Sequence, residues 1–281
     1  MPIRQYVSLL GVTFPFYGIC VGVALLAIGI WMIYNFKKFK MDGDQQNEIL
    51  YGFPFMSLMG LFFAFALDSL FTGDWRTWTG SEERRVGFTF TGWLFGAVLF
   101  MALFGGFTSF GRMFLLNMFL PIFALAQGIG RIGCFLGGCC YGKVCTWGIK
   151  YPPGSFPYEK VGDVCVFPIQ LIESLFLFFL FAICLHVAFR HRAVVYLLGV
   201  AVIRFVAEFF RGDIRGNVPG VMCMSPQQIM SILFFVIGLM VFIIDLRKKK
   251  EFAELFCACG TIPGCSAIMK NWENKSREEK E

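Results

Sequence analysis

Seven apolar stretches, each about as long as a membrane span, limit what this chain can fold into. About 20 mostly apolar residues in a helix cross the hydrocarbon core of a bilayer. Hydrophobic residues make up 57% of the 281 residues and charged residues 16%, which is typical of a multi-pass membrane protein and excludes an ordinary soluble domain. The sequence therefore predicts an all-α, polytopic membrane protein with seven transmembrane helices. The expected spans are Thr13–Phe36, Ile49–Phe71, Gly87–Phe110, Met113–Phe135, Pro168–Phe189, Ala193–Phe210 and Pro226–Leu246.

Basic residues between these spans predict the orientation, because short cytoplasmic loops carry an excess of Lys and Arg. Basic clusters follow the first, fifth and seventh spans, at residues 37–40, at Arg190 and Arg192, and at residues 247–250. Arg112, between the third and fourth spans, lies on the same side. The pattern predicts that the N-terminus faces outward and that the C-terminus is cytoplasmic.

The domain organisation is expected to be simple. Residues 1–246 are predicted to form one membrane domain, and residues 247–281 a charged cytoplasmic tail that is partly disordered, because the tail alternates basic and acidic residues. Function is therefore expected within the bundle and its three outer segments. These segments are Thr72–Val86, Cys140–Phe167 and Arg211–Ser225.

Two arginines interrupt the apolar pattern, Arg131 at the outer end of the fourth span and Arg204 inside the sixth. A charge at mid-membrane costs about 3 kcal/mol on insertion scales, so such residues usually serve a task. Glu208 and Arg211 follow Arg204 at i+4 and i+7, which would place all three on one helix face, with Glu208 partly neutralising both arginines. Because the planar guanidinium binds phosphate bidentately, the charges indicate an anionic ligand at the membrane. Structural salt bridges are the alternative interpretation.

The fourth span ends in a glycine-rich motif at residues 130–142, Gly-Arg-Ile-Gly-Cys-Phe-Leu-Gly-Gly-Cys-Cys-Tyr-Gly. Glycines permit close packing and positive φ, and they expose backbone N–H groups, so the motif is expected to form an anion cradle beside Arg131. Gln170 and Glu173 add a polar pair near the outer end of the fifth span. The predicted substrate-binding residues are Tyr17, Thr91, Gly92, Gly130, Cys134, Gly138, Cys139, Gly142 and Gln170.

Three motifs together resemble the prolipoprotein diacylglyceryl transferase family. They are the motif at residues 130–142, Phe-Pro-Ile-Gln-Leu-Ile-Glu at residues 167–173, and Arg-Phe-Val-Ala-Glu-Phe-Phe-Arg at residues 204–211. They occur in the family's order and spacing, and the resemblance runs from Tyr17 to about Leu246.

Members of this family are seven-span enzymes of the bacterial inner membrane with the N-terminus outside. The resemblance implies transfer of the diacylglyceryl group of phosphatidylglycerol to the lipobox cysteine of a prolipoprotein signal peptide, with release of glycerol phosphate. The implied partners are these two substrates and the lipid bilayer, with no nucleic acid.

The resemblance also implies roles for individual residues. Arg131 resembles the arginine of the family signature, Arg204 the essential arginine of the sixth span, Glu208 and Arg211 its supporting pair, and Glu173 the carboxylate of the fifth span. These five are the predicted catalytic residues. Fixed guanidinium groups would stabilise the charge that develops on the departing phosphate. No metal and no other cofactor is predicted.

The chain departs from the family pattern at three positions. Thr91 stands where the family has histidine, Cys134 where asparagine is usual, and Cys139 where an acidic residue is usual. The chain's two histidines, His186 and His191, lie toward the expected cytoplasmic side. Three alternatives therefore stay open: a related transferase with another acceptor or lipid, a transporter for an anionic solute, and a catalytically silent protein that binds lipid.

Five of the 11 cysteines cluster around the second outer segment. Structural cysteines are favoured there over a catalytic thiol or a metal ligand, and an oxidising exterior would allow disulfides, although the adjacent Cys139 and Cys140 would rarely bond to each other. Cys257, Cys259 and Cys265 in the tail lack the spacing of a zinc ribbon. The clustered cysteines are Cys134, Cys139, Cys140, Cys145 and Cys165.

Overall fold

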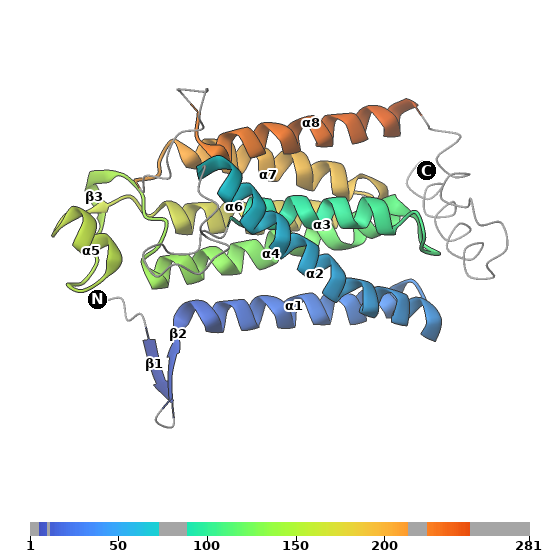
Figure 1. Ribbon diagram of the computed structural model, residues 1–281, viewed down its shortest axis with the longest axis horizontal. Helices are drawn as coiled ribbons and strands as arrows, with labels where there is room; N and C mark the ends of the chain where they lie inside the picture. The colour runs from blue at the N-terminus through green and yellow to red at the C-terminus, as the bar shows by residue number, and fades with distance from the viewer. Residues whose placement is uncertain (1–5, 10–11, 73–88, 213–223, 248–281) are drawn as a thin grey trace. The chain divides into compact units, whose positions relative to one another are not determined.

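The computed structural model describes residues 6–9, 12–72, 89–212 and 224–247 (Figure 1). The chain divides into two compact units. The first unit comprises residues 1–31 and 120–238, and the second comprises residues 32–119 and 239–281. The predicted tail, most of the outer segment at residues 72–86 and most of that at residues 211–225 lie outside the described residues.

A β-hairpin precedes the first helix, which the sequence did not predict. Strands β1 (Tyr6–Leu9) and β2 (Val12–Pro15) pair antiparallel, and helix α1 runs over Phe16–Lys38. Helix α1 therefore begins three residues after the expected start of the first span at Thr13. Pro15 explains the difference, because a residue that precedes proline is disfavoured in the α conformation and tends to be extended.

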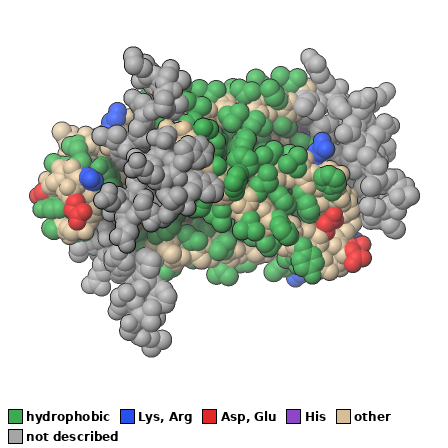
Figure 2. Space-filling model, viewed as in Figure 1, with side chains coloured by type: hydrophobic (Ala, Val, Ile, Leu, Met, Phe, Trp, Pro, Cys, Tyr) green, Lys and Arg blue, Asp and Glu red, His purple; other side chains and the backbone are tan. Residues whose placement is uncertain are grey.

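Most of the described chain is helical, and five helices are long and apolar enough to cross a membrane. The further helices α3 and α7 are shorter, with 15 and 17 residues. Exposed faces carry large apolar side chains, such as Leu26 and Ile30 on α1, which are each 68% exposed. Figure 2 shows such green side chains over the described surface. The chain is thus a multi-pass membrane protein. The five long apolar helices are α1, α2 (Gly43–Thr72), α4 (Arg112–Gly137), α6 (Ile169–His186) and α8 (Pro226–Arg247).

Helices α4, α6 and α7 (Arg192–Glu208) pack closely within the first unit because small residues face large ones. A Cβ added at Gly128 of α4 would lie 2.5 Å from the Phe178 ring of α6, and a Cβ at Gly199 of α7 would collide with Leu180 of α6. The Ser174 hydroxyl of α6 also donates a hydrogen bond to the Gly128 carbonyl, at 2.8 Å. A short 3₁₀ helix, η2 (Phe189–His191), connects α6 to α7. These contacts place the polar residues of the three helices near one another.

The segment between α4 and α6 forms a small cap with its own apolar core. It contains strand β3 (Val144–Ile149) and helix α5 (Phe156–Val161). Tyr141, Tyr151 and Val166 are buried together in it. Phe135 at the end of α4 packs against this core, which joins the segment to the helix.

In the second unit, α2 packs against α3 (Phe90–Phe104). A Cβ added at Gly92 or at Gly96 of α3 would approach the backbone of α2 to 2.8 Å or less. Small residues four apart allow such close approach of membrane helices. Gly92 therefore serves helix packing.

Candidate functional site

Glu173 of α6 is bonded to two arginines from two other helices. Its Oε2 lies 3.1 Å from Nε of Arg131 on α4, and its Oε1 accepts a hydrogen bond from a terminal nitrogen of Arg204 on α7. All three side chains are at most 8% exposed. Removing one partner from a buried ion pair leaves an uncompensated charge and typically costs 3–5 kcal/mol, so each of the three groups depends on the others.

Two polar atoms beside Glu173 retain bonding capacity. Nε of Arg204 and Oε1 of Gln170 are buried and have no hydrogen-bond partner within the part of the chain that the structure describes. An unpaired buried donor or acceptor is costly, and it often marks the place of a ligand or an ordered water. One donor and one acceptor are therefore available to a polar molecule here.

Arg211 was expected on the same helix face as Arg204, and this expectation is wrong. Helix α7 ends at Glu208, and the backbone N–H groups of Phe209 and Phe210 bond to carbonyls three residues earlier, which tightens the last turn. Arg211 then leaves the helix and forms an antiparallel bridge with Gly142. Nε of Arg211 lies 3.7 Å from Oε2 of Glu208. Glu208 thus pairs with Arg211, while the carboxylate that pairs with Arg204 is Glu173.

Gly142 lies where three backbone segments meet. Lys143 N–H donates to the Phe210 carbonyl, Phe167 N–H donates to the Lys143 carbonyl, and Gly212 N–H donates to the Tyr141 carbonyl, each at 2.9 Å. A Cβ at Gly142 would collide with the carbonyl oxygen of Phe167. A glycine is therefore required for this junction, which holds Arg211 against the end of the glycine-rich motif.

Helix α4 ends in a Schellman turn. Gly138 has φ +72°, its N–H bonds to the Phe135 carbonyl, and the N–H of Cys139 bonds to the Cys134 carbonyl. Cys140 follows with φ +57°, which is uncommon for a residue other than glycine. The two left-handed residues turn the chain back toward the helix that it has just left.

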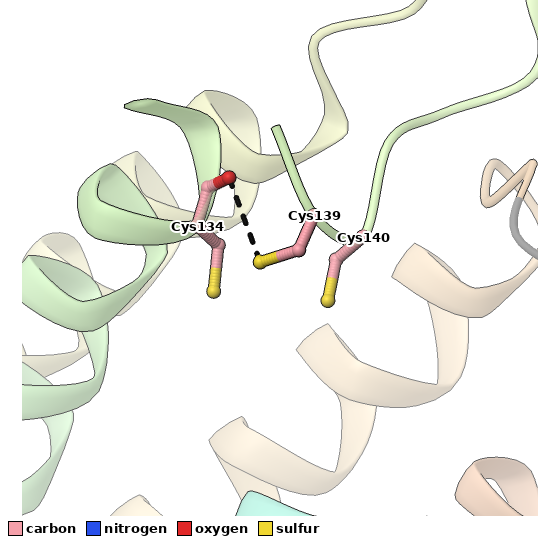
Figure 3. A group of neighbouring side chains, drawn as sticks. All are labelled: Cys134, Cys139 and Cys140. Carbon is pink, nitrogen blue, oxygen red and sulfur yellow. Dashed lines mark hydrogen bonds between the residues drawn. The ribbon is translucent and has the colours of Figure 1, made fainter. Parts of the chain in front are cut away.

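This turn brings three thiols together (Figure 3). The sulfur atoms of Cys134, Cys139 and Cys140 all lie within 4.8 Å of one another. The Cys139 thiol also donates to the Cys134 carbonyl, at 3.7 Å. Hydrogen bonding to Cys134 and Cys139, and then the positive charges of Arg211 and Arg131, lower the pKa of the Cys140 thiol against the effect of burial.

Gln170 fixes this turn from the side of α6. Its Nε2 donates to the Cys139 carbonyl, at 2.9 Å, and to the Tyr151 hydroxyl, at 3.3 Å. Burial raises the pKa of Tyr151, and the hydrogen bond from Gln170 acts in the opposite direction. The Tyr151 hydroxyl also donates to the Phe135 carbonyl, at 3.3 Å. Gln170 thus supports the end of α4, and its contact with substrate, expected from the sequence, stays a prediction.

Tyr17 of α1 lies beside the same part of α4. A Cβ added at Gly133 would be 3.2 Å from the Tyr17 ring and 3.0 Å from Cβ of Cys20. The Tyr17 hydroxyl is close enough to Arg131 to interact with its charge. At Gly130 an added Cβ would meet open space, so this face of α4 is accessible.

Thr91 and Gly92 belong to the second unit, and the other predicted site residues belong to the first. Thr91 is only 2% exposed. The structure shows how these two residues pack within the second unit. Their contact with substrate stays a prediction.

Sequence reasoning did not single out Tyr151, Gly133 or Cys20. No spacing rule connects Tyr151 to Gln170, 19 residues later, because their contact arises from the folded cap. Gly133 was recognisable as part of the glycine-rich motif. Cys140 was noted among the clustered cysteines, but its left-handed backbone could not be foreseen because non-glycine residues rarely adopt it.

Comparison with known proteins agrees with the arrangement of the motifs. A family model described as prolipoprotein diacylglyceryl transferase matches residues 4–244. The phosphatidylglycerol–prolipoprotein diacylglyceryl transferase of Clostridium tetani is 33% identical over 169 residues, which are 58% of this chain and 66% of that protein. A second enzyme of that name, from Clostridium perfringens, is 33% identical over 176 residues, covering 60% of this chain and 66% of that protein.

The alignments with these two relatives thus span just under two thirds of their length. A third relative of the same name, from Dehalococcoides mccartyi, is 26% identical over 242 residues, which are 84% of this chain and 90% of that protein. The family model covers all three motifs and every described helix except the last residues of α8. On these grounds, the chain belongs to the prolipoprotein diacylglyceryl transferase family.

Proposed function

We propose that this protein transfers the diacylglyceryl group of phosphatidylglycerol to the lipobox cysteine thiol of prolipoproteins. The observation that carries the proposal is the bonding of Glu173 to both Arg131 and Arg204. Together with the pair Arg211 and Glu208, the cluster has three guanidinium groups and two carboxylates, which leaves one positive charge in excess. A phosphodiester headgroup carries one negative charge, so it suits this cluster.

The proposed reaction is a substitution at the glyceryl carbon. The acceptor thiolate forms the new sulfur–carbon bond, and the electron pair of the broken carbon–oxygen bond leaves with glycerol phosphate. Negative charge therefore increases on the departing phosphate. Arg131 and Arg204 are held in place by Glu173 before the reaction, so they can stabilise this charge without reorganising. Arg204 Nε and Gln170 Oε1 offer the phosphate and the glycerol hydroxyls a donor and an acceptor.

The proposed topology is seven spans in the bacterial inner membrane, with the N-terminus outside, within a membrane domain of residues 1–246. Five helices meet the length and apolarity of a span, and the shorter α3 and α7 would be the remaining two. The distribution of Lys and Arg supports this orientation. Reporter fusions placed in each connecting segment would test it.

The activity is tested with purified protein in detergent, phosphatidylglycerol labelled in the diacylglyceryl group, and a lipobox peptide. Arg204→Ala is expected to reduce transfer at least 100-fold. Arg192→Gln is the matched control, because Arg192 is also a buried arginine of α7 but donates to the carbonyls of Leu185 and Val187. Wild-type transfer by Arg204→Ala would refute the assignment of the site.

The same assay separates the open alternatives. Transfer in detergent needs no sealed compartment, whereas transport of an anionic solute does. Folded wild-type protein that transfers nothing to a cysteine peptide, but modifies another thiol or a hydroxyl, would show a different acceptor. No transfer to any acceptor would favour a protein that only binds or transports lipid.

A further inference from the structure

The three thiols of Cys134, Cys139 and Cys140 form the only group of three or more metal-ligating side chains found among the described residues. One comes from α4, and two come from the turn that ends it (Figure 3). All three side chains are partly exposed, and none of the three forms a disulfide within the described residues. The group is therefore both concentrated and accessible.

The backbone holds these thiols in place before any ligand binds. The Schellman turn at Gly138 sets Cys139 beside Cys134, and the left-handed Cys140 adds the third sulfur. A non-glycine residue in this conformation costs energy and persists only where the surrounding structure requires it. Gln170 bonds to the Cys139 carbonyl and so stabilises the turn from α6.

We propose that Cys134, Cys139 and Cys140 bind a Zn²⁺ ion whose fourth coordination position receives the thiol of the acceptor cysteine. The role of the fourth position rests on the proposed transferase function, whereas the metal site itself does not. This inference departs from the sequence prediction that no metal is needed.

The distances suit such a site. A zinc–sulfur bond of about 2.3 Å places the sulfurs of a tetrahedral site roughly 3.8 Å apart. The observed limit of 4.8 Å requires only small side-chain movements. Arg131 and Arg211 lie near enough to interact with the thiols, and their charges would offset part of the negative charge of three thiolates.

Zinc with three protein ligands and an open fourth position is typical of catalytic sites, whereas structural sites are closed by a fourth protein ligand. A coordinated thiol is deprotonated, so the metal would supply the thiolate that the proposed reaction needs.

The step balances without an oxidant or reductant. The three protein thiols and the acceptor thiol each release a proton to solvent when they bind Zn²⁺. The acceptor sulfur then donates an electron pair to the glyceryl carbon, the carbon–oxygen bond breaks, and its electron pair leaves with glycerol phosphate. The thioether product binds the metal weakly and leaves, which returns the three-thiolate site.

Metal binding is tested without reference to activity. Reduced protein in detergent is expected to bind one Zn²⁺ per chain, and one Co²⁺ with the absorption bands of sulfur-to-cobalt charge transfer. Cys134→Ser, Cys139→Ser and Cys140→Ser are each expected to weaken binding at least 100-fold. Cys184→Ser is the control, because Cys184 is a buried cysteine of α6 near Arg192. Equal binding by wild type and the three variants would overturn the site, and so would binding of Cu⁺ without Zn²⁺.

A second measurement keeps the test valid if a variant does not fold. Zn²⁺ added to wild-type protein is expected to protect Cys134, Cys139 and Cys140 from maleimide, as read by mass spectrometry of peptides, while Cys145 and Cys165 stay reactive. Unchanged reactivity of the three thiols would refute the site.

The fourth position is tested with the Co²⁺-loaded protein. A lipobox cysteine peptide is expected to intensify the charge-transfer bands, and the matching serine peptide is not. Metal binding without any transfer would contradict the proposed function but not the metal site. Transfer that survives both complete removal of metal and loss of all three thiols would contradict the metal-dependent step and leave the proposed function standing.

Discussion

Nε of Arg131 lies 3.1 Å from Oε2 of Glu173, and this ion pair joins α4 to α6. The other oxygen of the same carboxylate bonds to Arg204 of α7. One acidic side chain therefore orients two guanidinium groups that come from different helices. Rotation of either arginine would leave a buried charge without its partner, so their positions are determined together.

Glu173→Gln is expected to reduce transfer about 100-fold or more. The neutral amide keeps the size of the side chain but removes the charge that holds both arginines, and it directs donors at one of them. Initial rates measured over a range of phosphatidylglycerol concentrations would separate loss of binding from loss of kcat. The matched control is Glu48→Gln, in which the altered carboxylate accepts a hydrogen bond from Ser109 in the second unit, at 2.7 Å. Equal effects of the two substitutions would contradict a special role of Glu173.

Gly138→Ala is expected to destabilise the end of α4. Gly138 has φ +72°, and placing a Cβ in this region costs roughly 1–2 kcal/mol. The unfolding temperature in detergent should fall, and the three thiols of the cysteine cluster should become more reactive with maleimide. Gly29→Ala in α1 is the control, because its added Cβ meets nothing within 4 Å. If Gly138→Ala changed neither the unfolding temperature nor the reaction of the thiols with maleimide, the turn would not depend on the glycine.

Gly142→Ala is expected to abolish most of the transfer activity while leaving the long helices folded. The added Cβ would collide with the Phe167 carbonyl and force Gly142 away from Arg211. Transfer rate and circular dichroism should be measured together. Gly137→Ala, five residues earlier in an open position, should keep most of the activity. Full activity of Gly142→Ala would mean that the position of Arg211 is unimportant.

Gln170→Met is expected to loosen the turn that contains Cys139. The substitution keeps an unbranched side chain but removes the donor to the Cys139 carbonyl and to the Tyr151 hydroxyl. Losing such bonds typically costs about 1 kcal/mol each, so the maleimide reaction of Cys139 should accelerate severalfold. Time courses read by mass spectrometry would measure it, with Cys145 as the internal reference. Identical time courses for the two proteins would exclude the supporting role.

Thr91→His, which restores the usual family residue, is expected to lower stability without raising activity. Thr91 is 2% exposed, and inserting a larger side chain at a packed position typically costs 1–3 kcal/mol. The unfolding temperature and transfer rate would be compared with those of Thr91→Ser. A gain in transfer rate would show that the chain lacks a base which the metal site does not replace.

Hydrophobicity and charge along the chain were enough to identify a multi-pass helical membrane protein and the residues that carry its family motifs. The length of an apolar stretch can be read directly from the sequence, because it depends only on neighbouring residues. The long helices therefore lie close to the expected spans. Proline also acts locally, but its effect at Pro15 was overlooked, and the hairpin before α1 was missed.

Only the tertiary structure decided which charges pair. Helical periodicity predicted that Glu208 partly neutralises both Arg204 and Arg211. The folded chain keeps the pair of Glu208 with Arg211, but it bonds Arg204 to Glu173, 31 residues away, and takes Arg211 off the helix to meet Gly142. Cys134 and Cys139, which the sequence predicted as substrate contacts, also converge with Cys140 through a backbone turn. Sequence alone determined which residues are costly to keep in a membrane, because that cost depends on each residue and its segment. Their partners depend on how distant helices and loops pack, and this was decided by the tertiary structure.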